Sequence, residues 1–378
     1  MTKKQRIYFD NAATTPLSEE VRERMCALMQ TCWGNPSSIH AEGRKARALV
    51  EQARKTVATC LGASIGEIFF TSGGTESNNM ILKNSVRDLG VRRIISSPLE
   101  HHSVLHSLQR LERAGVEVVY LPVDQKGRID LEELRSLLAQ EVQHTLVSLM
   151  YVNNEIGNVL DLESVSNLCL GYGALFHSDT VQGLGRYPLN LSDLKLNFLS
   201  GSAHKFHGPK GVGLVYINSE NIIGPFLDGG AQERNMRGST ENVYGIVGLA
   251  LALQTAVEEM AERRQKIEQV KFRFKKRLLQ EFRDVRFEGD DENSHYTILS
   301  VSFPPSGKSD LLLMLLDIEG VSASGGSACS SGVEQGSHVL EAIRADEKRK
   351  MVRFSFSHYN TVEEVDSTVD ILKKILYS

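Results

Sequence analysis

Apolar positions in the first two thirds of the chain alternate between helical and strand-like spacing. Ser18 precedes apolar residues at Val21, Met25, Leu28 and Met29, the spacing of an amphipathic helix with its N-cap. Short strand-like runs follow at 93–99, 116–123, 145–152, 174–179, 196–200 and 212–217. Helices that alternate with apolar strands predict an α/β fold, in which a mostly parallel sheet is flanked by helices on both faces.

The pattern changes near Asn242, where a long helical stretch begins and continues to about Phe282. Its second half carries an apolar stripe at Ile267, Val270, Phe274 and Leu278. We expect this helix to bridge two domains. Residues 13–255 would form the large domain.

The remainder predicts a smaller α/β domain made of residues 1–12 together with 256–378. Residues 296–303 and 352–357 have the composition of strands. Thr361 and Glu364 form a capping box that opens a final helix, whose apolar stripe is Val365, Val369, Leu372 and Leu376.

Composition and charge exclude several classes of function. The chain has 378 residues, 41% of them hydrophobic and 24% charged, which is enough for two globular domains. Its 43 basic and 47 acidic side chains give a net charge of −4, so no nucleic-acid partner is expected. No apolar run approaches the roughly 20 residues that span a bilayer, so we expect a cytoplasmic protein with no membrane partner.

The five cysteines are Cys26, Cys32, Cys60, Cys169 and Cys329. Their number is odd, they lie far apart, and no C-x-x-C spacing occurs, so neither a disulfide framework nor a metal site is indicated. One of these cysteines could instead take part in a reaction.

A turn of small residues, 71–79, follows the apolar run 68–70 and precedes a helical pattern. Small residues let backbone N–H groups approach an anion, and the helix N-terminus adds partial positive charge, so a phosphate could bind there. The alternative is an ordinary turn between a strand and a helix.

Asp179 ends another apolar strand, and Gln182 follows three residues later. A carboxylate in this place can keep a pyridine nitrogen protonated, and the glutamine amide could donate to a phenolic oxygen on the same ring. The alternative is that Asp179 caps a helix.

Lys205 lies just after the apolar run 196–200, among serine, glycine and histidine residues. A desolvated lysine amine can form an imine with an aldehyde cofactor, although most lysines are solvated surface charges. The ordered set of a phosphate turn, an aspartate and a lysine, each at a predicted strand end, favours the imine.

With these motifs together, nearly the whole chain resembles the NifS/IscS-type cysteine desulfurases, which are fold-type I pyridoxal-phosphate (PLP) enzymes of the class V aminotransferase group. The matching stretches are 8–16, 34–38 with His40, 71–79, Glu100 with His101, 152–157, 177–182, His204 and Lys205 with 208–211, 229–230 with Glu233 and Arg234, and 327–329.

The resemblance implies a role for each matching residue. Lys205 would hold PLP covalently in the large domain, with Asp179 on the ring nitrogen, Gln182 on the phenolic oxygen and His101 over the ring face. The phosphate ligands would be Gly74, Thr75, Ser202 and His204, with Thr240 reaching across from the second subunit of a homodimer. Asn154 and Arg353 would hold the substrate, and the guanidinium would bind its carboxylate through two hydrogen bonds.

Cys329 lies in a small, polar, glycine-rich stretch, 322–332, in the predicted small domain. A structural cysteine is usually packed among apolar residues, whereas this setting suits a mobile, exposed nucleophile. The resemblance implies that L-cysteine becomes L-alanine while Cys329 takes the sulfur as a persulfide, with His101 or the substrate accepting the thiol proton. The sulfur would pass to an acceptor protein, either an iron–sulfur scaffold or a thiolation enzyme for tRNA or a cofactor.

Two departures from the family pattern stand out. The stretch 236–240 reads Met-Arg-Gly-Ser-Thr, with Gly and Ser in the opposite order to the usual one, which puts the contact made by Thr240 in doubt. His358 stands where the family often has arginine. A selenocysteine lyase or another class V enzyme is the nearest alternative function, and a non-enzymatic binding module is a distant one.

Overall fold

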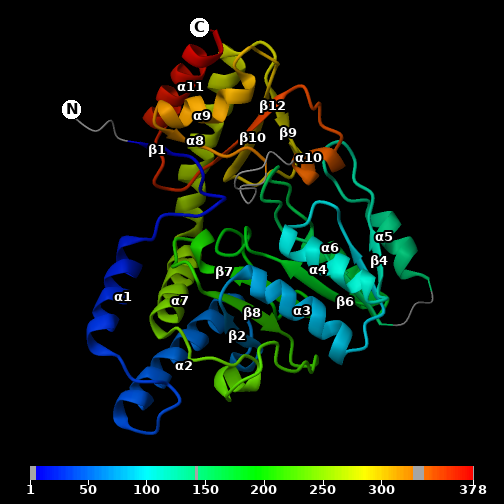
Figure 1. Ribbon diagram of the computed structural model, residues 1–378, viewed down its shortest axis with the longest axis vertical. Helices are drawn as coiled ribbons and strands as arrows, with labels where there is room; N and C mark the ends of the chain where they lie inside the picture. Colours follow the sequence, from blue (N-terminus) through cyan, green and yellow to red (C-terminus); the bar gives the residue numbers. More distant parts are fainter. Residues whose placement is uncertain (1–5, 141–143, 327–335, 378) are drawn as a thin grey trace.

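The computed structural model describes residues 6–140, 144–326 and 336–377. Within them, seven strands form the main sheet in the order β2-β8-β7-β6-β5-β3-β4 (Figure 1). β8 is the antiparallel member, so the predicted mostly parallel sheet is confirmed. The strands are β2 (Ile68–Thr71), β3 (Arg93–Ser96), β4 (Glu117–Tyr120), β5 (Thr145–Ser148), β6 (Leu175–Asp179), β7 (Phe198–Ser202) and β8 (Gly213–Ile217).

Successive residues of each central strand enter two different hydrophobic cores, because side chains alternate between the faces of a sheet. One face packs against α1 (Glu19–Thr31), α2 (Ala41–Leu61), α5 (Leu131–Leu138), α6 (Leu162–Gly171) and α7 (Val243–Glu258). Its strand residues include Phe70, Ile95, Val147, Leu199 and Leu214.

The other face packs against α3 (Gly74–Asp88) and α4 (His102–Arg113). Its strand residues are the sequence neighbours Phe69, Ile94, Leu146, Phe198 and Val215. Helices therefore cover both faces, as the alternating pattern predicted.

The helical stretch 242–282 is two helices rather than the continuous one that we predicted. α7 ends at Glu258, α8 (Met260–Glu281) follows, and the pair is bent by 75°. The reason is that the two halves serve different cores, since α7 is buried against the main sheet while α8 packs in a second core. The predicted stripe of α8 is confirmed, because Ile267, Val270, Phe274 and Leu278 are all buried.

The second core belongs to a smaller unit, drawn above the main sheet in Figure 1. It combines Phe9 with residues from Ile267 to Ile375, so the start and the end of the chain share one core. The domain division, with boundaries at 12/13 and 255/256, stays a prediction. The Thr361–Glu364 capping box is present, with each side chain accepting from the other residue's backbone N–H.

The elements of this unit are one antiparallel sheet, one short parallel pair and four helices among the described residues. The sheet has the order β12-β10-β9, from β9 (Arg286–Glu288), β10 (Ile298–Phe303) and β12 (Lys350–Ser355), and β1 (Ile7–Tyr8) pairs with β11 (Val321–Ser322). The helices are α8, α9 (Leu312–Ile318), α10 (His338–Ala342) and α11 (Val362–Tyr377).

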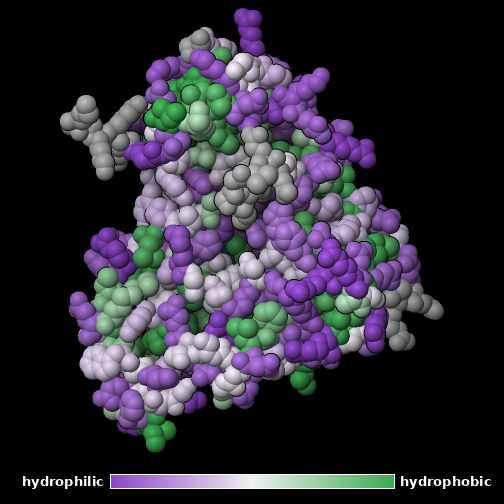
Figure 2. All heavy atoms as spheres, viewed as in Figure 1, coloured by the Kyte–Doolittle hydropathy of each residue, from purple (hydrophilic) through white to green (hydrophobic). Residues whose placement is uncertain are grey.

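Hydrophilic residues cover most of the face shown in Figure 2, and hydrophobic residues gather near the top, over the region of α8, α9 and α11. Exposed apolar side chains of this unit include Leu311, Met314 and Ile318. None of the described helices is long and apolar enough to cross a membrane by itself. The bent pair α7 and α8 reaches that length and composition only when the two helices are taken together.

Candidate active site

A cavity of about 330 Å³ brings together most of the residues that the sequence singled out. It lies where β6 and β7 end and α3 begins, which is where open α/β sheets bind their ligands. Ten predicted site residues line it: Gly74, Thr75, His101, Asn154, Asp179, Gln182, Ser202, His204, Lys205 and Arg353.

Lys205 enters the cavity from a short 3₁₀ helix, Ala203–Lys205, directly after β7. Its amine donates hydrogen bonds to the backbone oxygens of Ala12 at 2.5 Å and Ala13 at 2.9 Å. These two alanines belong to the segment that links β1 to α1, so the amine is held between the N-terminal segment and the end of the sheet.

Asp179 is buried at the end of β6 with both carboxylate oxygens engaged. Oδ2 accepts from the Asn78 side-chain amide at 2.7 Å, and Oδ1 accepts from the backbone N–H of Val181 at 3.0 Å. The residues that follow form hydrogen-bonded turns, not a helix, so the helix-cap alternative is wrong. Gln182 Nε2 donates to Ala12 O at 2.8 Å, while its Oε1 is buried without a partner.

The predicted anion turn opens α3. Gly73 occupies the N-cap position and offers no side-chain cap, so the first N–H groups of the helix and its positive dipole end are directed to the cavity edge. Gly74 is required there, because a Cβ would lie 2.6 Å from Val181 Cγ2. Burial, together with the charges of Lys205 and Lys210, lowers the pKa of the neighbouring His204 to about 4.

His101 caps α4 through its ring. Nδ1 accepts from the Ser103 backbone N–H at 3.1 Å and lies 2.8 Å from the Ser103 hydroxyl. This geometry assigns the ring proton to Nε2. Burial lowers the pKa of His101, the nearby Lys205 charge acts in the same direction, and Asp179 partly offsets both. His101 is therefore a neutral imidazole that can donate from Nε2.

Arg353 is a buried residue of β12 in the cavity wall. Its guanidinium donates to the backbone oxygen of Asn154 at 2.7 Å and to Asp10 Oδ1 at 2.9 Å, while Nε has no partner. A guanidinium has five N–H donors, so these contacts orient the group and leave donors for a carboxylate.

The cavity residues that were given no role from the sequence include the polar side chains of Asn78, Glu155 and His338. Asn78 and Glu155 lie inside stretches that carried the family resemblance, which was the available signal. His338 lies outside those stretches, and nothing in the sequence marked it.

Of the predicted site residues that the structure describes, Thr240 does not line the cavity. Thr240 is exposed in this chain, and its contact across a dimer stays a prediction. Cys329 lies outside the described residues.

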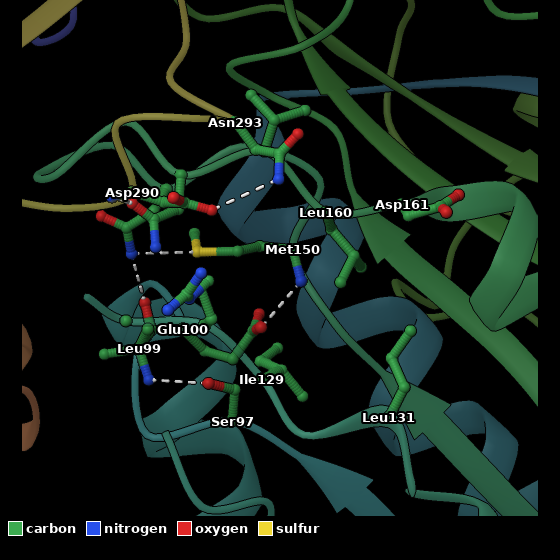
Figure 3. Close-up of a pocket in the computed structure, with 15 residues that line it drawn as sticks. Ser97, Leu99, Glu100, Ile129, Leu131, Met150, Leu160, Asp161, Asp290 and Asn293 are labelled. Carbon is green, nitrogen blue, oxygen red and sulfur yellow. Dashed lines mark hydrogen bonds between the residues drawn. The ribbon is translucent and has the colours of Figure 1, made fainter. Parts of the chain in front are cut away.

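A second cavity of about 190 Å³ adjoins the first at Met150 (Figure 3). Figure 3 shows Glu100 Oε1 accepting from the Met150 backbone N–H, at 2.7 Å, while the buried Oε2 has no partner. Burial, joined by repulsion from Asp179, raises the pKa of Glu100 well above its ordinary value despite this bond. The described lining residues include no lysine or cysteine, so the cavity around Lys205 is the candidate active site.

Comparison with known proteins shows which family the chain resembles over nearly its whole length. Residues 7–368 match the family model for aminotransferase class-V. The chain is 41% identical to a cysteine desulfurase IscS from Dictyoglomus turgidum, over 99% of this chain and 95% of that protein. A solved NifS-like protein superposes with a TM-score of 0.91 at 39% identity, over 99% of this chain and all of that one. Another solved structure, SspA in complex with cysteine, gives a TM-score of 0.81 at 32% identity, over 94% of this chain and all of that one.

Proposed function

We propose, since the chain belongs to the aminotransferase class-V family and within it to the NifS/IscS-like cysteine desulfurases, that it converts L-cysteine to L-alanine and transfers the sulfur to Cys329 as a persulfide. The observation that carries the proposal is that Asp179 and Lys205, at the ends of the paired strands β6 and β7, line one cavity with Arg353 from β12.

The residues of this cavity fit PLP. The start of α3 with Gly74 can take a phosphate, Asp179 can pair with a ring nitrogen, and Gln182 and His101 lie on the same walls. Lys205 would hold the cofactor by its amine. Bound there, PLP supplies an aldehyde for a primary amine and a ring that accepts the electron pair left when the Cα proton departs.

The protein's own side chains would then bind the amino acid and move its protons. Arg353 and Asn154 orient the substrate carboxylate, and the Lys205 amine, once released, removes the proton from Cα. His101 holds a proton at Nε2 and can donate it. Because Nδ1 already accepts from Ser103, His101 can take the proton of a thiol only after Nε2 has given up its own.

The sulfur step balances without an added oxidant. The Cys329 thiolate forms a bond to the substrate sulfur as the Cβ–S bond breaks, Cβ keeps the electron pair and takes a proton, and Lys205 returns a proton to Cα. The products are L-alanine and a persulfide on Cys329. We propose that an iron–sulfur scaffold or a thiolation enzyme receives this sulfur, and that the enzyme is a homodimer in which Thr240 reaches the partner's phosphate site.

The test is Cys329→Ala. We expect alanine production from L-cysteine to be abolished while the absorbance of bound PLP is retained, because the change removes the sulfur acceptor and leaves the Lys205 cavity intact. Cys26→Ala removes an exposed thiol on α1 and is the matched control with normal turnover. Normal alanine production by the Cys329→Ala variant would refute the proposed function.

A further inference from the structure

Helix α10 begins on the wall of the active-site cavity, fixed by two side-chain hydrogen bonds. Ser337, its N-cap residue, donates from Oγ to Glu155 Oε2 at 2.5 Å. The next residue, His338, donates from Nε2 to the backbone oxygen of Glu100 at 2.9 Å. The start of α10 is therefore attached both to the loop after β3 and to the loop after β5.

Gly326, the last described residue before the stretch 327–335, is buried beside the same carboxylate. A Cβ placed on Gly326 would lie 2.8 Å from Ser337 Cβ and 3.4 Å from Glu155 Oε2. Two residues earlier, Ser324 pairs with Arg353 through two backbone hydrogen bonds, of 3.2 and 2.6 Å. The two sides of the stretch that contains Cys329 thus meet at Glu155, next to the residue expected to hold the substrate carboxylate.

Glu155 is itself held firmly. Its backbone N–H donates to Asn153 Oδ1 at 2.9 Å, and its backbone oxygen accepts from the Ser300 hydroxyl. The side chain is 1% exposed and lines the cavity beside Asn154. A carboxylate fixed in this way can act as a rigid anchor for a flanking segment.

We propose that Glu155 is a positioning residue for the sulfur-transfer step. Its carboxylate binds Ser337 and lies close to Gly326, and so it fixes where the chain enters and leaves the stretch with Cys329 relative to the substrate. This inference rests on the proposed function. The physical reason is proximity, because the rate of a reaction between two groups falls steeply when their relative placement is lost.

The role predicts an effect on one step of the reaction. The Glu155 carboxylate accepts from Ser337 Oγ, whereas the Lys205 amine donates to Ala12 and Ala13 and the Asp179 carboxylate accepts from Asn78 and Val181. Loss of the carboxylate should slow sulfur transfer to Cys329 and leave the binding of L-cysteine and of PLP in place. A general structural role would instead weaken cofactor binding, substrate binding and thermal stability together.

The experiment uses the PLP-loaded enzyme and compares Glu155→Ala, Glu155→Asp and Glu155→Gln. The product assay measures alanine formation. The matched control is Glu341→Ala, which removes an exposed carboxylate from α10. The measurements are kcat and KM for alanine formation, the rate of persulfide formation on Cys329, and the change in PLP absorbance when L-cysteine is added. Glutamine keeps the length and the acceptor oxygen, whereas aspartate keeps the charge and loses the reach.

We expect Glu155→Ala and Glu155→Asp to lower kcat and the rate of persulfide formation by about tenfold or more, the value of one hydrogen bond to a charged group. KM and the absorbance change should stay close to wild type, and Glu155→Gln should recover most of the rate. Ser337→Ala, which removes the same bond from the other side, should reproduce the loss, and the double variant Glu155→Ala/Ser337→Ala should lose no more.

Several results would overturn the inference. Wild-type persulfide formation in Glu155→Ala would do so, and so would loss of bound PLP in parallel with kcat in every Glu155 variant. If Glu155→Ala does not fold, an unaltered rate in Ser337→Ala decides against the inference. Failure of the wild-type enzyme to form alanine from L-cysteine overturns the proposed function as well, which separates the two failures.

Discussion

Lys205 and Lys271 are two partly buried lysines with similar first contacts and very different surroundings. The amine of Lys205 donates to the backbone oxygens of Ala12 and Ala13. The amine of Lys271, on α8, donates to Ser294 Oγ and to the backbone oxygen of His295, both at 2.8 Å. Burial, with repulsion from Lys275, lowers the pKa of Lys271 to about 8.

The wider surroundings distinguish the two amines. Lys271 borders a hollow of about 280 Å³ whose other charged residues are Glu268, Lys275, Glu288, Asp290 and Asp291. Lys205 shares its cavity with a helix N-terminus, a doubly hydrogen-bonded carboxylate, three imidazoles of lowered pKa and a guanidinium with an open donor. Burial of the amine is therefore not enough to identify a reactive lysine. What identifies it is the set of chemically matched groups around the amine.

The largest expected effect separates the two lysines directly. Lys205→Ala should lower alanine formation by about 10³-fold or more, because it removes both the group that holds the cofactor and the base for the Cα proton. Lys271→Ala is the matched control and should keep the absorbance of bound PLP and normal turnover. Equal losses of activity in the two variants would contradict the distinction drawn between their surroundings.

The second-largest expected effect on activity concerns the carboxylates near the two lysines. Asp179→Asn should lower alanine formation by about 10²-fold, the usual effect of removing one preorganised electrostatic contact from a reacting group. The loss should persist at saturating PLP, since the neutral amide cannot hold a positive charge on the ring nitrogen. Asp291→Asn removes a carboxylate beside Lys271 and should leave the rate unchanged. A wild-type rate in Asp179→Asn would remove Asp179 from the mechanism.

The sequence indicated Lys205 and Asp179 because their signals are local. Each follows a short apolar run, and polar residues at the ends of parallel strands meet at one edge of the sheet. The same reasoning extended the strands too far: the run 93–99 forms a strand only to Ser96, where the chain turns toward Glu100 and the cavity. Met29 was placed on the buried stripe of α1 but is 52% exposed.

Contacts between distant segments could not be predicted in this way. The bond between Glu155 and Ser337 joins residues 182 positions apart, and no pattern in either segment specifies the other. The bend between α7 and α8 has the same cause, because helical spacing continues across Glu258 and Met260 while the core that each half contacts changes. Tertiary packing decides both features.

The smallest expected effect is on the free energy of unfolding, and it comes from the Lys271 amine. Below pH 8 its amine is protonated in the folded and the unfolded chain. Between about pH 8 and 10.5 the unfolded chain keeps this proton while the folded chain has lost it, so the free energy of unfolding rises with pH. Relative to Lys271→Met, the free energy of unfolding of the wild type should rise by at most about 3 kcal/mol and then level off.

Denaturant unfolding of the wild type and of Lys271→Met across this pH range measures the difference, in which the titration of all shared groups cancels. Lys276→Met gives the effect of removing an exposed lysine from the same helix. Parallel curves for the wild type and Lys271→Met would mean that the Lys271 amine is solvated in the folded chain. The contrast with Lys205 would then be one between a buried and an exposed lysine, and burial would regain its value as a marker of the reactive amine.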